Sequence, residues 1–442
     1  MDRLKVLLIC HFSNPEVRSK LNLRKDREYH DFAVWITNRI LAYEKSNALE
    51  LYVVAPHKGM KYRRQAFVSN GIHYHFYTAG NKAHKLLSIA LSYGMHKVGK
   101  NVLGSIIAKI REVYLNISYL PQKQYVGELV REIKPDIIHL NGAENPYYSA
   151  TVLGLEKYHI PICISIQGIV GDPQVLLASN FNDMSRIKIE HEIHSRYKYY
   201  IIGSAEHHRL VKLDNPSAVF MHSPGIRTIN IDPTVEEVHK EYDFVFMARV
   251  TPFKGIEHVL MAMKSLTEDY PDLSLLVLGP VSKKYLSHLQ SICKDYGIAD
   301  RVAFAGHIPL REDLFRQALK AKIFVLPTTF EGLATSAVEA MLLGLPVVTY
   351  ATGGMPFLNK DGENVLMCET GDIAGLTMNM KRLLKDPDFA ERLAKKGQSF
   401  AHRVFGEGPN LELNIRQYRA IIENHRDRSP IPADLLFDGT YR

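Results

Sequence analysis

Short apolar runs alternate with amphipathic helical stretches along this chain of 442 residues, and that alternation most limits its possible folds. Parallel strands that are covered on both faces are apolar along their whole length, and a helix usually connects each to the next. Amphipathic stretches, such as 29–45 and 183–197, separate apolar runs in the first half. The pattern predicts a parallel sheet with helices on both faces. The runs lie at 5–12, 49–56, 135–142, 161–168 and 199–204.

The same alternation starts again in the second half, with apolar runs at 243–250, 273–280, 301–308, 323–328 and 346–351. We therefore predict an α/β chain with two Rossmann-like, doubly wound domains that face a central cleft. The segment between them is polar and lacks a clear period, so we expect a linker there. The predicted parts are an N-terminal domain at 1–226, the linker at 227–242, a C-terminal domain at 243–405, a helix at 406–426 that can pack back on the N-terminal domain, and a tail at 427–442.

The amino-acid composition limits which kinds of partner and which cellular compartment are expected. The formal net charge of +8 and the pI of about 9.0 favour anionic partners, such as nucleotides and sugar phosphates. Cys10, Cys163, Cys293 and Cys368 lie far apart without a CxxC pair, which argues against a zinc site or a disulfide framework. The N-terminus lacks the apolar length of a signal peptide, and no run reaches the roughly 18 apolar residues of a membrane span. We expect a cytoplasmic protein.

The stretch 82–120 departs from the strand–helix pattern, since it is rich in Leu, Ile, Tyr, Lys and Arg. One interpretation is a basic amphipathic helix or hairpin that contacts an anionic membrane, which would make the protein peripheral at the inner face of the cell membrane. The other interpretation is a helical insertion that packs on its own domain. Nucleic-acid binding has only the net charge in its favour, without any motif, so no nucleic-acid partner is expected.

The segment EGLATSAVE places Glu331 and Glu339 eight residues apart, across a predicted loop and the start of a helix. Eight residues of helix span about 12 Å, whereas carboxylates that share acid–base work lie roughly 5–9.5 Å apart. The two glutamates are therefore expected to contact different parts of one long ligand. The helix is predicted from about Thr335 to Leu343, with Gly344 as its stop.

The start of this helix has the features of a phosphate site. Unpaired N–H groups and the positive end of the helix dipole attract anions, and Gly332 allows the main chain to approach a ligand closely. Leu333 and Ala334 lead into the helix. Thr335 or Ser336 is expected to cap the helix and to donate to a phosphate oxygen. A diphosphate with hydroxyl-bearing groups at either end fits this arrangement.

A second strand–loop–helix junction in the same half is cationic. Arg249 ends the predicted strand, Lys254 follows five residues later, and Gly255 comes next. Arginine can clamp a phosphate through two N–H groups, and lysine neutralises it as a point charge. Two phosphate-type loops in one domain therefore strengthen the prediction of a diphosphate site.

These segments resemble those of retaining, nucleotide-sugar-dependent glycosyltransferases of the GT-B fold, specifically the family-four group. The sequence FEGLATSAVEAMLLGLPVV is similar to the E-x7-E segment of that group, and ARVTPFKGIEHVLMAM is similar to its R-x4-K-G segment. The sequences VAFAGHIP and ATGGMPFL match two further segments of the donor domain. The resemblance is strong over about 240–400 and weaker over 1–225.

The resemblance implies a role for each matching residue. Arg249, Lys254 and Glu331 would be catalytic: the two cations would stabilise the leaving diphosphate, and the carboxylate would contact the transferred sugar. Glu339 would hold the ribose hydroxyls. No metal and no cofactor are expected, because two cations and a helix dipole supply the positive charge. The other donor-binding residues that the resemblance implies are Gly306, His307 and Ile308 for the base, and Gly332, Leu333, Ala334 and Thr335 for the phosphates.

The N-terminal half departs from the family pattern. The loop after the first strand reads CHFSNPEVRSK, without the usual glycines, and makes Asn14 and Arg18 candidates for acceptor contacts. Gln167 and Gly168 stand where many members carry a His-Gly or His-Asp pair. Glutamine can hydrogen-bond a hydroxyl but cannot act as an acid or a base, so a histidine-dependent step is not expected.

The expected activity is transfer of a sugar from a nucleotide diphosphate donor, with a UDP-sugar favoured, to an acceptor hydroxyl with retention of configuration. The expected acceptor is a saccharide or a lipid-linked saccharide, in surface polysaccharide or glycolipid assembly. Two alternatives stay open: a GT-B-type epimerase or phosphorylase, and a non-catalytic subunit that binds a nucleotide sugar. A binding subunit would hold the donor intact, whereas a transferase would slowly release nucleoside diphosphate.

Overall fold

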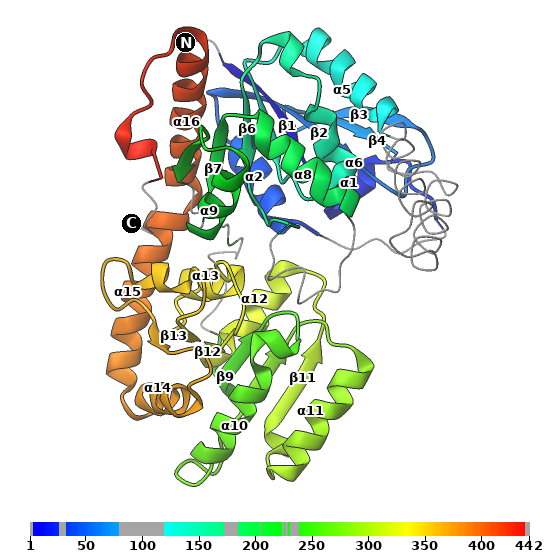
Figure 1. Cartoon of the computed structure of the whole chain (residues 1–442). Helices are drawn as coiled ribbons and strands as arrows, with labels where there is room; N and C mark the ends of the chain where they lie inside the picture. Colours follow the sequence, from blue (N-terminus) through cyan, green and yellow to red (C-terminus); the bar gives the residue numbers. More distant parts are fainter. Residues whose placement is uncertain are drawn as a thin grey trace, which may run out of the picture. The chain divides into compact units, whose positions relative to one another are not determined.

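The computed structural model describes residues 3–25, 32–78, 119–171, 184–203, 205–222, 225, 229 and 238–437. The chain divides into two compact units, and each has its own sheet (Figure 1). Unit 1 comprises residues 1–224 and 411–439, and unit 2 comprises residues 225–410 and 440–442. Both units alternate strands and helices, which confirms the predicted α/β class with two Rossmann-like domains.

Some expectations fall on parts of the chain that the structure does not describe. Of the basic stretch 82–120, only 119–120 are described, and its contact with a membrane stays a prediction. The predicted linker 227–242 also lies mostly outside the described residues. Within the ranges given above, no helix is long and apolar enough to span a membrane. The four cysteines are free thiols.

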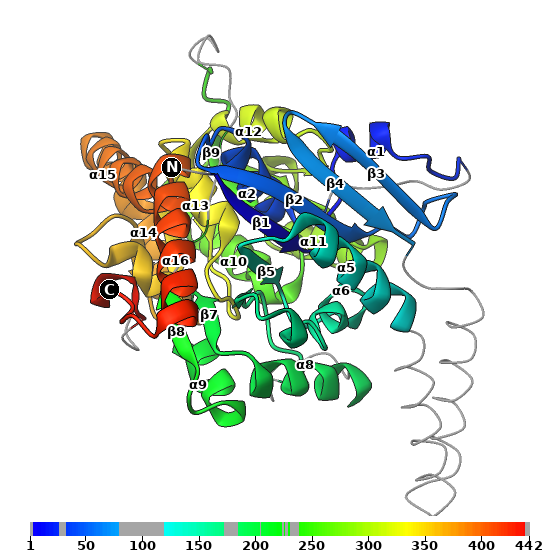
Figure 2. The ribbon, with the colours of Figure 1, turned by 90° about the horizontal axis from the view of Figure 1, so that it is seen from above.

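The sheet of unit 1 has its strands in the order β3-β4-β2-β1-β5-β6-β7-β8. Five of these strands occupy the apolar runs predicted for the first half, and every residue of β5 is buried. Neighbouring strands are parallel except for one antiparallel hairpin, β3 with β4, which forms an edge of the sheet (Figure 2). The bounds are β1 (Leu4–Ile9), β2 (Leu49–Pro56), β3 (Arg64–Ser69), β4 (Ile72–Tyr77), β5 (Ile137–Asn141), β6 (Ile162–Ser165), β7 (Tyr199–Ile202) and β8 (Val219–His222).

The hairpin of β3 and β4 is absent from the sequence-based expectation. Residues along β3 alternate between exposed and half-buried, so the strand has no continuous apolar run. Asn70 and Gly71 connect the two strands with φ angles of 50° and 76°. Positive φ at both central residues is typical of a type I′ turn, for which Asn-Gly is the preferred pair. That pair is the local signal that could have revealed the hairpin.

Helices cover both faces of the unit 1 sheet. In Figure 2, α5, α6 and α8 lie on one side of the central strands and α2 lies on the other. Val126 and Val130 of α5 pack with Ile138 and Leu140 of β5 in one apolar cluster. The helix bounds are α1 (Pro15–Lys20), α2 (Val34–Glu44), α5 (Leu120–Ile133), α6 (Pro146–Ser149), α8 (Met184–Arg196), α9 (Ala205–Asp214) and α16 (Glu407–Asp427).

Helix α16 comes near the end of the sequence, yet from residue 411 it belongs to unit 1. The Oη atom of Tyr418 lies 2.6 Å from Nδ1 of His139 in β5 and 2.7 Å from Oη of Tyr43 in α2. Asn414 accepts a further hydrogen bond from the Tyr43 hydroxyl at 2.8 Å. These side chains are buried, so the interior of unit 1 includes residues from both ends of the sequence.

Unit 2 is a parallel sheet with the strand order β11-β10-β9-β12-β13-β14. Its apolar core is continuous and includes Phe244, Phe246, Phe324 and Tyr350, all 0% exposed. The strand bounds are β9 (Tyr242–Met247), β10 (Leu275–Leu278), β11 (Val302–Gly306), β12 (Ala321–Leu326), β13 (Val347–Tyr350) and β14 (Leu366–Cys368). The helices are α10 (Ile256–Leu266), α11 (Lys283–Asp295), α12 (Arg311–Leu319), α13 (Thr335–Leu342), α14 (Ile373–Lys385) and α15 (Pro387–Phe405).

Each sheet has a point where the strand order reverses direction. In unit 1 the reversal lies between β1 and β5, because β2 is on the other side of β1. In unit 2 it lies between β9 and β12, because β10 is on the other side of β9. Open parallel sheets bind ligands beyond the carboxyl ends of their strands at these switch points. Ligand-binding residues are therefore expected in the loops that follow β1, β5, β9 and β12.

Candidate active site

The turn after β9 is fixed against the end of β12. Its short 3₁₀ helix (Pro252–Lys254) ends at Gly255, which has a φ of 75°. A Cβ atom at Gly255 would lie 2.0 Å from the carbonyl oxygen of Pro327, so only glycine fits between these two loops. The N–H of Thr329 donates to the carbonyl oxygen of Phe253 at 2.8 Å. The two loops at the switch point of unit 2 are thus held together by backbone contacts.

Lys254 and Glu331 meet across this switch point. Lys254 comes from the turn after β9, Glu331 comes from the loop after β12, and their side chains form an ion pair. The side chains are 25% and 21% exposed, so the pair is accessible to a ligand. A cation and a carboxylate that lie 77 positions apart in the sequence are therefore neighbours, which neither sequence motif alone could show.

Arg249 lies two residues after the end of β9 and is exposed. No residue within the described ranges forms an ion pair with it, so its guanidinium is available to an anion. The main chain beside it is constrained, since a Cβ atom at Gly279 would lie 1.9 Å from the carbonyl oxygen of Ala248. Arg249 thus projects from a fixed strand end on the same turn as Lys254.

The start of α13 differs from the prediction in one respect. The helix begins at Thr335 and is followed by Gly344 with a φ of 74°, as expected. The N-cap, however, is Ala334, and no side chain caps the helix. The prediction that Thr335 or Ser336 caps it is wrong, because both already lie within the first helical turn. The N–H of Ala337 donates to the carbonyl oxygen of Ala334 at 3.1 Å, and the N–H of Ala334 donates to Sδ of Met355 at 3.3 Å. The N–H groups of Thr335 and Ser336 have no partner among the described residues, so they stay available to an acceptor such as phosphate.

The loop that leads into α13 is supported from behind by residues 353 and 354. The N–H of Gly354 donates to the carbonyl oxygen of Gly332 at 2.6 Å. A Cβ atom at Gly353, which has a φ of 55°, would lie 1.8 Å from the carbonyl oxygen of Glu331. A Cβ atom at Gly332 itself would meet no atom within 4 Å, so its outer face is open to a ligand. Leu333 packs against the core of unit 2.

Glu339 is 4% exposed and carries a partner that the sequence analysis missed. Nη2 of Arg311, at the start of α12, donates to Oε1 of Glu339 at 2.5 Å. The Arg311 side chain is 31% exposed and also lies over the Phe315 ring at 4.8 Å. Arg311 has no motif of its own, and its distance of 28 positions from Glu339 explains why a local pattern could not reveal it. A ribose-binding role for Glu339 stays a prediction.

Replacing Arg311 with alanine is expected to destabilise unit 2 by about 1–3 kcal/mol at neutral pH, because Glu339 would keep its buried charge without a partner. The Arg311→Lys protein restores a cation and should recover part of the loss. Urea unfolding followed by circular dichroism measures the effect. An unchanged unfolding midpoint in Arg311→Ala would show that the pair contributes nothing to stability.

The predicted base-binding residues lie at the end of β11. Gly306 is the last residue of the strand and has a φ of 72°. His307 follows and is exposed, and Ile308 packs against the core of unit 2. The structure thus places all three beside the end of a strand, in the unit that contains Lys254 and Glu331. Their contact with a base stays a prediction.

The acceptor-side candidates lie after β1 and β6 in unit 1. The Asn14 side chain caps α1 by accepting from the Val17 N–H at 2.8 Å, and the residue is 8% exposed. Nη1 of Arg18 donates to Oγ of Ser13 at 3.1 Å. Gln167 and Gly168 follow β6 and are half-buried. Asn14, Gln167 and Gly168 therefore lie in connections that follow strands, whereas Arg18 lies within α1, and the role of all four with an acceptor stays a prediction.

The loop after β5 contains a carboxyl group that sequence reasoning missed. Burial raises the pKa of Glu144 from 4.5 to about 7. The Tyr148 hydroxyl lies 3.0 Å from Oε1, and Oε2 is buried without a hydrogen-bond partner within the described residues. Near neutral pH this carboxyl group therefore exchanges a proton more readily than an ordinary glutamate. The Asn-Gly-Ala-Glu sequence, which begins at the last residue of β5, carries no signal for such burial.

The stability of unit 1 is expected to fall as pH rises through 7. The folded protein binds the Glu144 proton more tightly than the unfolded chain does, so this stabilisation is complete below pH 4.5 and is lost above 7. The difference between 4.5 and about 7 corresponds to about 3 kcal/mol. Glu144→Gln should remove this loss and be more stable than the parent protein at pH 8.

Fluorescence of Trp35, the single tryptophan, reports the unfolding of unit 1 in such a measurement. The exposed Glu132 provides a matched control, since Glu132→Gln should leave the pH dependence unchanged. A Glu144→Gln protein with the same pH dependence as the parent would exclude Glu144 as its source.

Metal ligands are not grouped in the described part of the chain. No cluster of three or more His, Cys, Asp or Glu side chains in those ranges has the geometry to hold a metal ion. The expectation that no metal takes part therefore remains a prediction, which activity in the presence of a chelator tests.

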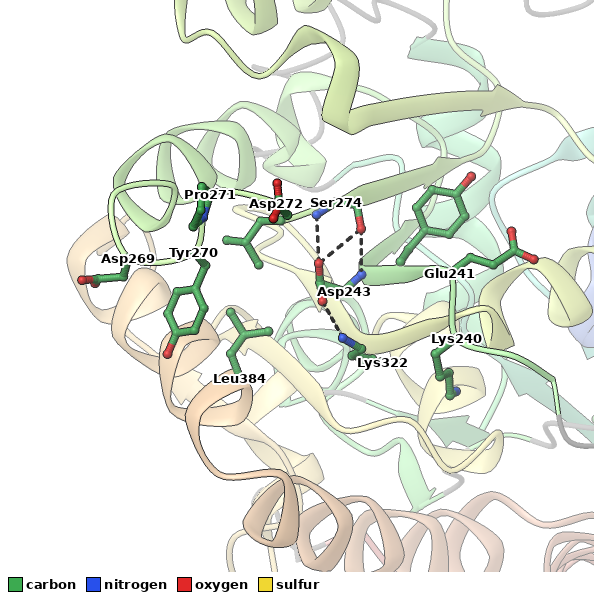
Figure 3. Close-up of a pocket in the computed structure, with 12 residues that line it drawn as sticks. Lys240, Glu241, Asp243, Asp269, Tyr270, Pro271, Asp272, Ser274, Lys322 and Leu384 are labelled. Atoms are coloured by element: carbon green, nitrogen blue, oxygen red, sulfur yellow. Dashed lines mark hydrogen bonds and ion pairs between the residues drawn. The ribbon is translucent and has the colours of Figure 1, made fainter.

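A pocket of about 510 Å³ opens in unit 2 at the amino ends of β9, β10 and β12 (Figure 3). Asp243 lies at its centre, where Oδ1 is 2.8 Å from Nζ of Lys322 and Oδ2 accepts from the Ser274 N–H at 3.0 Å. These strand ends are opposite those that carry Lys254 and Glu331. The pocket is therefore separate from the switch point, and Asp243 and Lys322 at its centre already pair with each other.

Comparisons with known proteins find a family match in sequence for most of unit 2. Residues 229–400 match the family described as Glycosyl transferases group 1. A GDP-mannose-dependent alpha-(1-6)-phosphatidylinositol monomannoside mannosyltransferase of Mycolicibacterium smegmatis is 29% identical over 210 residues, which cover 44% of this chain and 54% of that protein. The chain thus spans about half the length of the curated relatives that it matches.

Solved structures extend the likeness to nearly the whole chain. Sucrose-phosphate synthase from Thermosynechococcus elongatus has a TM-score of 0.69 at 18% identity, covering 94% of this chain and 98% of its own. The Anabaena protein HepE, in complex with UDP and glucose, has a TM-score of 0.62 at 14% identity, covering 94% and 99%. At such identities the likeness shows the fold. The chain therefore has the GT-B fold, and its residues 229–400 match the group 1 glycosyl transferases in sequence.

Proposed function

We propose that this protein is a glycosyltransferase that moves a sugar from a nucleotide diphosphate donor to an acceptor hydroxyl with retention of configuration. One observation carries the proposal: Lys254 and Glu331 meet at the switch point of unit 2, beside Arg249 and the uncapped start of α13. This arrangement offers two cations and free N–H groups to a diphosphate, and a carboxylate to a sugar hydroxyl.

The residues of unit 2 act on the charge that develops during transfer. The bond between the anomeric carbon and the diphosphate oxygen breaks, so negative charge grows on the leaving diphosphate. Arg249, Lys254 and the first-turn N–H groups of α13 stabilise that charge. The acceptor hydroxyl bonds to the anomeric carbon from the same face and passes its proton to a diphosphate oxygen. This route retains the configuration and needs no protein base.

The ion pair of Lys254 and Glu331 positions both groups before the donor binds. When a diphosphate takes the ammonium group of Lys254, the Glu331 carboxylate becomes able to accept hydrogen bonds from the sugar. The backbone contacts around Gly255 and Gly353 keep the two loops in place during this exchange. Such preorganisation lowers the reorganisation that the transition state requires.

A UDP-sugar is the first donor to test and a GDP-sugar the second. The HepE structure holds UDP and glucose, and the mycobacterial relative is named for GDP-mannose. We propose a saccharide or lipid-linked saccharide as the acceptor, in surface polysaccharide or glycolipid assembly. The relative named for a phosphatidylinositol monomannoside agrees with a lipid-linked acceptor.

A thermal-shift screen with UDP-, GDP- and ADP-sugars, followed by hydrolysis of the stabilising donor, tests the proposal. We expect one donor to raise the melting temperature and to release nucleoside diphosphate slowly in the absence of acceptor. A donor that binds without any release, even with acceptor extracts, would favour a non-catalytic subunit. Conversion of the donor without transfer would favour an epimerase, and no binding of any of them would refute the assignment.

A further inference from the structure

Unit 1 contains a buried cation at its own switch point. Arg39 lies in α2 and is 7% exposed, and its guanidinium group reaches the carboxyl ends of β5 and β6. Nη1 donates to Oδ1 of Asn141, the last residue of β5. The same atom lies 3.3 Å from Nε2 of His139 and 3.4 Å from Oγ of Ser165, the last residue of β6. Arg39 thus stands where a doubly wound sheet binds its ligand.

No charged group among the described residues balances Arg39. Its contacts are neutral, and none of the described residues offers it a carboxylate. Burial and the nearby guanidinium hold the pKa of His139 well below its ordinary value of 6.5, and burial raises the pKa of the Tyr43 hydroxyl to about 12. Burial also raises the pKa of the thiols of Cys10 and Cys163. Since arginine stays protonated, the cluster carries an unbalanced positive charge.

Asn141 adds a donor that lacks a partner. Its Oδ1 atom must face the guanidinium of Arg39, because the amide NH₂ group would be repelled there. Its Nδ2 atom is buried and forms no hydrogen bond with any residue that the structure describes. The residue is 2% exposed. Buried donors in folded proteins are nearly always paired with a protein group or ordered water, so this amide is available to an acceptor.

A purely structural role explains these features less well. The hydroxyls of Tyr43 and Tyr418, together with His139, already connect α2, α16 and β5 at distances of 2.7 and 2.6 Å. A neutral side chain could complete this network without the desolvation of a charge. An anion that contacts both Arg39 and Asn141 would instead balance the charge and accept from the unpaired amide.

We propose that Arg39 and Asn141 bind a phosphate group of the acceptor. The inference rests on the proposed function and narrows its acceptor to a phosphate-bearing molecule. A guanidinium fork can hold two phosphate oxygens, and a phosphate group presents a further oxygen to the Asn141 amide. The net charge of +8 agrees with an anionic acceptor.

Inorganic phosphate is the first probe, and the donor site must be disabled because it also attracts phosphate. The background is therefore the full chain with Arg249→Ala and Lys254→Ala. Calorimetric titration should show phosphate binding in this background, and the added change Arg39→Gln should weaken it by about tenfold or more. Equal affinities with and without Arg39 would overturn the proposal.

The Asn141→Asp change tests the same site if Arg39→Gln fails to fold. It places a carboxylate against Arg39 and so replaces the anion with a protein group. In phosphate-free buffer this variant should melt at a higher temperature than the same background, and phosphate should no longer raise its melting temperature. A rise with phosphate that equals that of the background would contradict an anion site at Arg39.

Two further binding experiments identify the kind of molecule that carries the phosphate group. Glycerol 3-phosphate represents a soluble acceptor, and vesicles of phosphatidic acid represent a lipid carrier, with phosphatidylcholine vesicles as the control. Arg39-dependent binding of either one supports the proposal and names the source, whereas dependence in neither arm overturns it. Nucleotide-sugar hydrolysis by the unmodified protein tests the proposed function separately, so the two can fail independently.

Discussion

The Lys254→Ala protein is expected to lose sugar transfer by about a hundredfold or more, with little change in overall stability. The ammonium group is placed at the switch point of unit 2 by the turn after β9 and contacts Glu331. If it neutralises the departing diphosphate, its removal costs about 2.7 kcal/mol or more in the transition state. Initial rates with saturating donor measure the effect.

Lys322→Ala is the matched control for this measurement. Lys322 also belongs to unit 2 and also forms an ion pair, at 2.8 Å with Asp243, but it lies near the amino end of β12. Its removal should leave turnover unchanged. Near-normal turnover of Lys254→Ala, or an equal loss in both proteins, would refute the role assigned to Lys254.

The second large effect is expected for the stability of Gly255→Ala. Alanine would have to adopt a φ of 75° and would place its Cβ atom 2.0 Å from the carbonyl oxygen of Pro327. The unfavourable φ alone costs about 1–3 kcal/mol, and the backbone clash adds to it because neither loop can move freely. We expect a loss of more than about 3 kcal/mol in unit 2, together with weaker donor binding.

The Gly297→Ala protein separates the cost of the positive φ from the cost of the backbone clash. Gly297 has a φ of 68°, nearly the same as Gly255, but an added Cβ atom there would meet nothing within 4 Å. It should therefore lose only about 1–2 kcal/mol. Hydrogen exchange of the α10 amides reports unit 2 directly. Equal losses in the two proteins would show that the contact between the turn and Pro327 contributes little.

The sequence predicts the central strands well because their chemistry is local. Strands buried on both faces are mostly apolar, and β5 and β12 appear where such runs occur. The edge hairpin of β3 and β4 has one exposed face and only the Asn70-Gly71 turn as a signal. The sequence therefore predicts a strand more easily when the strand is fully buried than when one of its faces is exposed.

In the candidate site, too, some features can be predicted from the sequence and others can be seen only in the structure. Glu331 and Lys254 lie in short segments whose residue types suit a diphosphate, so the sequence makes them candidates without the structure. Their contact, and the pairing of Glu339 with Arg311, arise from the strand order, which brings distant loops together. Arg39 was missed because nothing in α2 marks it until Asn141 and His139 are placed against it.

The path of the chain through unit 1 has a consequence for its biosynthesis. The chain leaves unit 1 after residue 224 and returns to it at residue 411. A ribosome therefore releases the first eight strands long before α16 emerges to give Tyr43 and His139 their buried partners. Domains generally fold as they are made. We infer that the N-terminal part of unit 1, although made first, is completed only after residues 225–410 of unit 2 have been translated.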